Sequence, residues 1–280
     1  MMFRDAAEIM GETPEDCHRS HVTGLRWKGF EPILTERIIS TGEERRLRLE
    51  PLDIFVSEAR RCVGARDGGP CHSQIEPRMS LCRSCDPFPV QECRFHPRCR
   101  GTMCDGTVCG EPHVVYLAIF ADQVKVGMTR LSRLRERGIE QGADIIVPLQ
   151  EHPNRQEARR AEQALSKDRG LPQAMSLSVL ASCLDDDAAE KAAMRWEELS
   201  GSMGPGVEPI LLDSYPLNGL VGVPKVMPTA GKHRGELMGC KGRLAVYRDE
   251  IGMLKALDMK DLVSRFLGTA PSRCAQSTLF

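Results

Sequence analysis

The chain has 280 residues, of which 41% are hydrophobic and 28% are charged, and its net charge is −1. This length suits one large domain or two small ones, and the hydrophobic fraction is sufficient for a packed core. A net charge near zero excludes a chain that is basic throughout, so any contact with nucleic acid has to come from a local patch. No apolar run approaches the ~18–20 residues of a membrane span, and the first residues lack the apolar segment of a signal peptide. We therefore expect a cytoplasmic protein without membrane contact.

The N-terminal region, residues 1–61, is predicted to be rich in β-structure. Its strand-like pieces, residues 36–39 and 47–52, are short and are separated by Gly and Pro, which interrupt regular structure. A C-terminal region, residues 201–267, begins with a Gly- and Pro-rich connector and returns to the same pattern. Its expected elements are strands at 210–212 and 236–247 and a short helix near 259–267. We expect the two β-rich regions to pack together and residues 268–280 to form a loose tail.

Cysteine is concentrated in one segment, residues 62–113. Eight of the 12 cysteines fall there within 48 residues: Cys62, Cys71, Cys82, Cys85, Cys93, Cys99, Cys104 and Cys109. Cytosolic thiols are kept reduced, and a segment rich in Cys, Pro, Gly and Arg cannot bury an apolar core, so bound metal is expected to hold it. The pair Cys82-x2-Cys85 has the spacing of a zinc knuckle, and eight thiolates suffice for two tetrahedral zinc sites.

The grouping of these cysteines is open on spacing alone. A sequential grouping would put the first four on one zinc ion and the last four on another, and an interleaved grouping is equally allowed. His72, His96 and His113 could each replace a thiolate. Four thiolates also suit an iron–sulfur cluster, and unliganded thiols in a flexible loop are the remaining alternative. Structural zinc is the favoured interpretation, because protein ligands can fill all four tetrahedral positions.

Residues 114–200 are predicted to form a compact α/β unit. The pattern indicates a hairpin, a short basic helix, a strand and two further helices. The expected ranges are 114–129 for the hairpin, 131–141 for the basic helix ended by Gly142, 144–149 for the strand, 154–167 for a helix that begins at Asn154 and ends near Gly170, and 185–199 for the last helix. The whole chain is therefore expected to belong to the α+β class.

Side chains suited to phosphate chemistry gather in this unit. Tyr116 lies on the first strand and Lys125 on the second, facing the same hairpin. Five cations fall within 13 residues, against the single acid Glu136: Lys125, Arg130, Arg133, Arg135 and Arg137. The spacing of residues 130, 133 and 137 would let their side chains share one helix face.

A carboxylate on the later helix belongs to the same pattern. Glu162 lies on the small apolar face of that helix, four residues after Ala158, so it needs an arginine or a metal as its partner. Each of these features has a plain structural alternative as well. Tyr116 could be a core tyrosine, the arginines could form a solvated helix face, and Glu162 could be an ordinary salt-bridge partner.

The unit also resembles the GIY-YIG nuclease superfamily. That family carries one motif on each strand of a hairpin, then an arginine on a helix and a metal-binding glutamate on a later helix. Val114-Val115-Tyr116 stands at the first motif and Lys125-Val126-Gly127 at the second, and Thr129 follows. The second motif is similar to a variant branch with KIG-x-T. Its lysine replaces a tyrosine that helps the chemistry in many members.

A resemblance to the family called domain of unknown function 2797 extends further along the chain. Its members are similar to this chain in the zinc-type cysteines and in four short motifs. These are Pro112-His113 through Ala118, Lys125 through Arg130, Arg137 through Ala143, and Gly239 through Gly242. The last motif, Gly239-x-Lys241-Gly242, indicates a strand with a bulge or a close backbone approach. Its lysine could instead extend a nucleic-acid surface.

The superfamily resemblance implies roles for individual residues. Tyr116 would be the base or would orient water, with Lys125 beside it. Arg137, or else Arg133 or Arg135, would stabilise the phosphate. Glu162 would bind Mg²⁺, a hard cation that prefers oxygen ligands. Further contacts with phosphate or nucleic acid are expected from Gly127, Thr129, Arg130, Arg133, Arg135 and Gln141.

The implied function is that of a zinc-containing protein that acts on nucleic acid as a metal-dependent endonuclease or phosphodiesterase. One alternative is a zinc-dependent module that binds DNA or RNA without cleaving it. Another is a protein-interaction scaffold in which zinc is purely structural. The choice between DNA and RNA and the oligomeric state stay open on the sequence.

Overall fold

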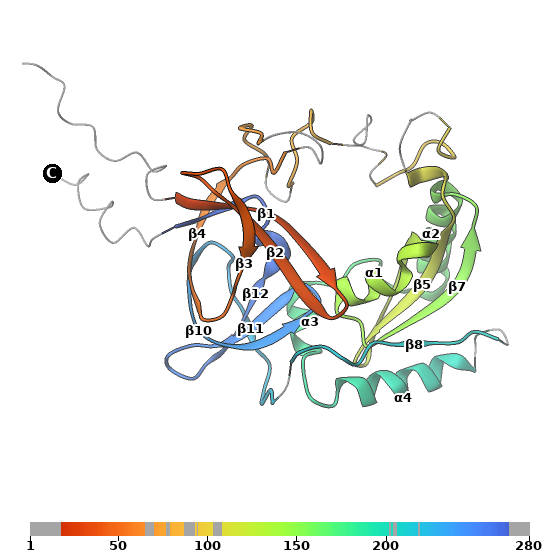
Figure 1. Cartoon of the computed structure of the whole chain (residues 1–280). Helices are drawn as coiled ribbons and strands as arrows, with labels where there is room; N and C mark the ends of the chain where they lie inside the picture. Colours follow the sequence, from red (N-terminus) through yellow and green to blue (C-terminus); the bar gives the residue numbers. More distant parts are fainter. Residues whose placement is uncertain are drawn as a thin grey trace, which may run out of the picture.

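The computed structural model describes residues 18–64, 70–76, 79–86, 93, 95–102, 108–201, 203, 206–217 and 219–268. These residues form two β-sheets with a few short helices, which confirms the predicted α+β class (Figure 1). Cys104 and the predicted tail beyond residue 268 lie outside the described residues.

The larger sheet combines strands from both ends of the chain. Its nine strands are ordered β3-β2-β1-β13-β4-β10-β11-β12-β9, and every described pair is antiparallel except β12 with β9. The strands are β1 (His18–Lys28), β2 (Glu31–Ile38), β3 (Glu44–Leu47), β4 (Leu52–Arg60), β9 (Lys225–Val226), β10 (Gly231–Lys241), β11 (Leu244–Arg248), β12 (Leu254–Asp258) and β13 (Arg265–Gly268). Because β13 lies between β1 and β4, the N-terminal and C-terminal parts of the chain share one hydrogen-bonded sheet.

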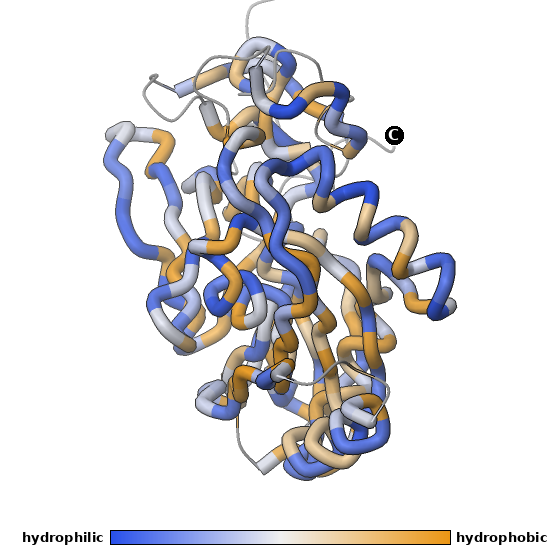
Figure 2. Tube along the Cα trace, turned by 90° about the vertical axis from the view of Figure 1, so that its right-hand side faces the viewer, coloured by the Kyte–Doolittle hydropathy of each residue, from blue (hydrophilic) through white to orange (hydrophobic). Residues whose placement is uncertain are grey.

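The smaller sheet has the order β6-β5-β7-β8 and is antiparallel. Its strands are β5 (His113–Phe120), β6 (Gln123–Arg130), β7 (Ile145–His152) and β8 (Ile210–Leu211). All eight residues of β5 are buried, because both faces of this central strand are covered. Val115, Leu117 and Ile119 pack toward α2 and α4, whereas Tyr116 and its neighbours of the same parity join the core shared with the larger sheet. Figure 2 shows hydrophobic residues concentrated along the inner strands and hydrophilic ones at the surface.

The helices largely follow the predicted ranges. They are α1 (Leu134–Gln141), α2 (Arg155–Arg169), α3 (Leu177–Ser182), α4 (Ala188–Ser200) and α5 (Met259–Leu262), with 3-10 turns at Val108–Gly110 and Leu131–Arg133. The side chain of Asn154 accepts a hydrogen bond from the backbone N–H of Glu157 at 3.0 Å, as expected of an N-cap. Gly142 and Gly170 end their helices in the left-handed conformation, at φ of +79° and +64°.

Two local predictions are wrong, and one short helix was missed. The strand expected at 47–52 is instead a connection, because β3 ends at Leu47 and β4 begins at Leu52. The helix expected at 259–267 stops after one turn, and the chain then enters β13 as a partner of β1 and β4. Helix α3 was not predicted, although Ser176 caps it by accepting from the backbone N–H of Val179 at 3.2 Å.

The two sheets meet at a tight joint that involves the Gly239-x-Lys241-Gly242 motif. Gly142 and Gly242 lie back to back, so a Cβ atom on Gly242 would come within 2.5 Å of the Gly142 nitrogen. Lys241 is buried and donates to Asp144 at 2.6 Å, and the other Asp144 oxygen accepts from the backbone N–H of Ala121. Lys241 is therefore structural and does not extend a nucleic-acid surface.

Candidate functional site

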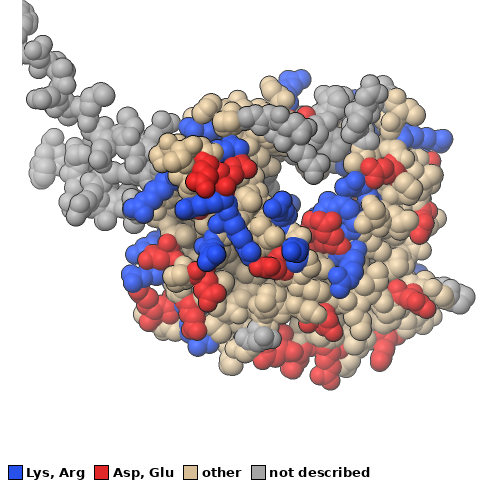
Figure 3. Space-filling model, in the orientation of Figure 1, with Lys and Arg blue, Asp and Glu red and all other residues tan. Residues whose placement is uncertain are grey.

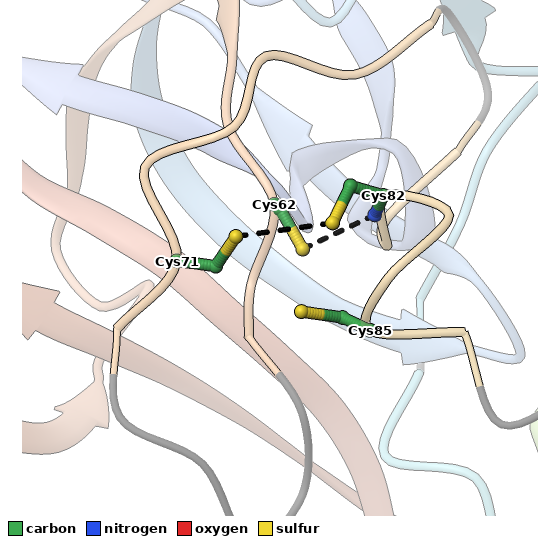
Figure 4. A group of neighbouring side chains, drawn as sticks. All are labelled: Cys62, Cys71, Cys82 and Cys85. Carbon is green, nitrogen blue, oxygen red and sulfur yellow. Dashed lines mark hydrogen bonds between the residues drawn. The ribbon is translucent and has the colours of Figure 1, made fainter.

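Four of the eight clustered cysteines come together beyond the end of β4 (Figure 4). The Sγ atoms of Cys62, Cys71, Cys82 and Cys85 all lie within 4.8 Å of one another. Cys82 and Cys85 belong to one tight turn, in which the backbone N–H of Cys85 donates to the Cys82 carbonyl at 3.1 Å. The first four cysteines of the segment are therefore neighbours in space, as in the sequential grouping.

The four thiols have the geometry of a tetrahedral metal site. Zn–S bonds of about 2.3 Å place two thiolates of a tetrahedron about 3.8 Å apart, and the Sγ atoms of Cys71 and Cys82 are 3.8 Å apart. Backbone N–H groups of Cys82 and Gly64 point at the sulfur of Cys62, at 3.1 and 3.4 Å. This donor set fits zinc, so the cluster could bind that ion.

The pKa values of these thiols differ in a way that a bound cation would remove. A hydrogen bond from the backbone N–H of Cys85 is the main cause that lowers the pKa of Cys82 to about 6. The pKa of Cys85 rises to about 12, mainly because its thiol is hydrogen-bonded to Cys82. One thiolate therefore forms at the expense of the next, and a bound dication would allow all four to ionise.

The cysteine-rich segment is attached to both sheets. Near the cluster, the backbone N–H of Cys62 donates to the carbonyl of Ser73, and that of Arg61 to Ser264, which precedes β13. Further along, Arg155 at the start of α2 donates to the Cys93 carbonyl at 2.8 Å and contacts Cys109 Sγ at 3.8 Å. A second zinc site made of the last four cysteines stays a prediction, because Cys104 lies outside the described residues.

Tyr116 lies deep in the smaller sheet on the face that contacts α1. The residue is 1% exposed, and its hydroxyl accepts a hydrogen bond from Gln141 Nε2 at 2.8 Å. Gly127 is its partner across the hairpin, and a Cβ atom there would lie 2.7 Å from the Tyr116 hydroxyl. Glycine at 127 thus makes room for the tyrosine ring. Burial raises the pKa of Tyr116 more than the Arg137 charge lowers it, so the hydroxyl is protonated at neutral pH.

Lys125, Arg137 and Glu162 lie close to Tyr116. Burial is the main cause that lowers the pKa of Lys125 to about 8, followed by repulsion from Arg137, while the charge of Glu162 opposes the shift. Arg137 and Glu162 also act on the pKa of Tyr116. The fold therefore brings together side chains from β5, β6, α1 and α2 that are up to 46 positions apart in the sequence.

Glu162 is buried and retains one oxygen for a ligand. The residue is 5% exposed, and its Oε2 pairs with Arg159 at 2.5 Å. Arg159 in turn donates to Gln173 at 2.7 Å. Oε1 of Glu162 makes no hydrogen bond to the described part of the chain. Mg²⁺ is often held by one or two carboxylates together with substrate phosphates and water, and this oxygen fits such a ligand.

The basic run is largely neutralised by Glu136 within it and by Glu111 and Glu140 outside it. Its ion pairs are Arg130–Glu111, Arg133–Glu136, Arg133–Glu140 and Arg137–Glu140. Arg135 packs over the Phe30 ring instead. The expectation of one shared helix face is wrong, because Arg130 ends β6 and Arg133 lies in a 3-10 turn before α1 begins. Arg137 is the arginine of the run that lies near Tyr116. Thr129 is half-buried on β6 opposite Val114.

Two cations outside the smaller sheet also act on these charges, and no sequence motif marks them: Lys260 on α5, and Arg243 in the turn between β10 and β11. Lys260, on α5, has its pKa lowered first by burial and then by repulsion from Arg243 and Arg137. Lys260 in turn lowers the pKa of Lys125. We call these four residues, Lys125, Arg137, Arg243 and Lys260, the cation cluster. Figure 3 shows Lys and Arg side chains on both sides of an opening between the two halves of the molecule.

Comparison with protein families gives one result. The family described as "Protein of unknown function (DUF2797)" matches residues 50–264, more than half of the 280 residues. The chain belongs to this family. The match covers the described cysteine cluster, the smaller sheet and all four members of the cation cluster. Neither the curated proteins nor the solved structures contain a match to the chain.

None of the helices in the described ranges is both long and apolar enough to cross a bilayer.

Proposed function

We propose that the protein is a metal-dependent phosphodiesterase that acts on nucleic acid, with the cysteine cluster as a structural zinc site. The observation that supports this is the grouping of Lys125, Arg137 and Glu162 around Tyr116, close enough for their charges to shift one another's pKa values. Phosphodiester hydrolysis requires cations around the phosphate, a group that orients water, and usually a metal. Each of these requirements has a candidate within this set.

Each side chain has a proposed role that its surroundings support. Tyr116 is protonated at neutral pH, so its hydroxyl suits the orientation of water or of a phosphate oxygen rather than proton abstraction. Arg137 is 39% exposed and its guanidinium can reach a phosphate as well as Glu140. Lys125 supplies a positive charge. Its burial strengthens the attraction between this charge and an anion, because the local dielectric is low.

Glu162 would hold Mg²⁺ through Oε1, while Arg159 fixes the other oxygen. When bound, the ion would polarise the phosphate and lower the pKa of its bound water. Gln141 holds the Tyr116 hydroxyl in place at 2.8 Å and Gly127 leaves room for the ring. This chain therefore supplies orientation and charge, and the position of Tyr116 is fixed before substrate arrives.

Cleavage of labelled nucleic acid tests the proposal. We expect the zinc-containing protein with Mg²⁺ to cut structured DNA or RNA, and Glu162→Gln to lose about 100-fold or more in rate. Glu198→Gln is the matched control, because Glu198 is exposed on α4 far from this set in the sequence. An uncut substrate with the wild type, or equal cutting by Glu162→Gln, would overturn the proposal.

A non-catalytic nucleic-acid-binding module is the second candidate. It is favoured by the burial of Tyr116 and by the pairing of Glu162 with Arg159, which leave cations as the groups ready for a ligand. This candidate predicts binding that weakens with salt, since each neutralised phosphate releases counterions. Unchanged affinity after Arg137→Glu would reject it.

A further inference from the structure

The guanidinium of Arg159 on α2 is engaged at one end and free along one edge. Its Nη1 donates to Glu162 Oε2 at 2.5 Å and to Gln173 Oε1 at 2.7 Å. Its Nε and Nη2 make no hydrogen bond to any residue in the described ranges, and Nε is buried. Nη2 is the accessible end of this free edge, on a side chain that is 21% exposed.

Hydrogen bonds attach this group of residues to the second strand of the hairpin. Strand β6 is at the edge of the smaller sheet, and the backbone N–H of Val126 donates to the carbonyl of Pro172 at 3.0 Å. The next residue, Gln173, is the one that accepts from Arg159. The ion pair of Arg159 and Glu162 is therefore connected to β6 at the middle of the second hairpin motif.

The free edge of Arg159 has the chemistry of an anion site. The Nε–H and one N–H of Nη2 point in nearly the same direction, so they can donate to two oxygens of one phosphate. A buried donor without an acceptor is costly, and a bound ligand is one way to supply the acceptor. Within the described chain, Glu162 is the carboxylate that pairs with Arg159, and it takes Nη1 rather than this edge.

We propose that Arg159 binds a phosphate of the substrate through its Nε–Nη2 edge, and that Gln173 is the positioning residue that aims this edge. The inference rests on the proposed function, in which the phosphate belongs to nucleic acid and Glu162 holds the metal. It adds a phosphate contact that no sequence motif marks. One turn of α2 would then carry both the carboxylate for the cation and the guanidinium for the anion, because the two residues are three positions apart.

Two probes test this inference on the full chain without added divalent metal. The first is inorganic phosphate, with binding followed by the rise in thermal stability that a ligand of the folded state produces. The second is a fluorescein-labelled oligothymidylate, with binding followed by anisotropy. We expect Arg159→Met to weaken both about tenfold, the loss typical of one charge-assisted hydrogen bond. Arg159→Lys should recover only part of the affinity, because an ammonium group lacks the two-donor edge of a guanidinium.

A double-mutant cycle separates positioning from charge. Gln173→Leu removes an uncharged acceptor at a half-buried position, so the fold should tolerate it. Because the Arg159 guanidinium then loses one of its two anchors, phosphate binding should weaken about threefold, as for one neutral hydrogen bond. The same change should have no further effect in the Arg159→Met background, since Gln173 acts through the arginine. Fully additive losses would refute the positioning role.

Arg195→Met is the matched control. Arg195 pairs with Glu198 three positions along its helix at 2.6 Å, and its Nε is likewise buried without a partner among the described residues. It lies on α4, which packs mainly against β5 and β7 rather than at the β6 edge. No phosphate binding by the wild type, unchanged affinity in Arg159→Met, or an equal loss in Arg195→Met would overturn the inference.

The outcome for this inference is distinguishable from that for the proposed function. Phosphate binding that depends on Arg159, in a protein that does not cut nucleic acid, would keep the anion site and refute the phosphodiesterase. Cutting that depends on Glu162, with phosphate affinity unchanged in Arg159→Met, would keep the phosphodiesterase and refute the role of Arg159.

Discussion

Replacing Lys125 by methionine is expected to stabilise the free protein, although the lysine belongs to the proposed site. Its pKa is about 8 in the fold against 10.5 for an unperturbed lysine, a difference of 10.5 − 8 = 2.5 units. Each unit corresponds to about 1.36 kcal/mol. At pH 7 the charged lysine therefore costs the folded state about 3 kcal/mol. This is an upper value, because the side chain is partly exposed and water screens part of the charge.

The pH dependence separates this electrostatic effect from better packing of methionine. A lowered lysine pKa means that the unfolded chain holds the proton more tightly than the folded chain. Wild-type stability should thus rise as pH increases from about 8 to 10.5, where the unfolded state binds more protons. The advantage of Lys125→Met should shrink from about 3 kcal/mol at pH 7 to about 1.4 kcal/mol at pH 9.5.

Urea denaturation at these two pH values is the assay. Lys232→Met controls for the loss of an exposed lysine and should change the free energy of unfolding by less than about 0.5 kcal/mol. A Lys125→Met variant that is less stable than wild type at pH 7 would refute the reasoning. The same holds for an advantage that does not fall at pH 9.5.

Two further predictions concern the joint and the cysteine cluster. Gly242→Ala should lower stability by more than Gly170→Ala, although both glycines have a left-handed backbone. A Cβ atom on Gly242 would lie 2.5 Å from backbone atoms, whereas a Cβ atom on Gly170 would have nothing within 4 Å. Equal losses of stability by thermal denaturation would contradict the contact. Cys82→Ser should lose one zinc ion per chain, measured by elemental analysis, and should have a lower melting temperature. Cys183→Ser, a change at a buried cysteine outside the segment, should keep the metal. Unchanged zinc content in Cys82→Ser would rule out that cluster as the zinc site.

Local signals in the sequence predicted elements whose ends are fixed by nearby residues. Helix α2 begins at its Asn154 cap and ends at Gly170, as expected, because cap and glycine act within one turn. The strand of residues 47–52 failed because short β-like pieces depend on partners far along the chain. Helix α5 stops at Leu262 for the same reason, since β13 pairs with strands some 200 or more residues earlier.

The candidate site divides in the same way. Spacing identified the Cys82–Cys85 turn and placed Glu162 on a buried helix face, because both depend on intervals of a few residues. Lys260 could not be found from its neighbours, since α5 reaches the cation cluster only through the packing of the two sheets. The partners of the arginine run were missed as well, because Glu140 lies one turn beyond it and Glu111 precedes the hairpin.

The back-to-back glycines have a consequence for how this architecture can be inherited. Neither Gly142 nor Gly242 can gain a side chain while the other backbone stays where it is, so the two positions are constrained as a pair although they are 100 residues apart in the sequence. A relative that keeps both glycines is expected to keep the two halves in the same orientation. A relative that lacks one of them is expected to have a different joint between the two sheets. The pair thus offers a way to recognise, from sequence, which relatives keep the two sheets in this arrangement.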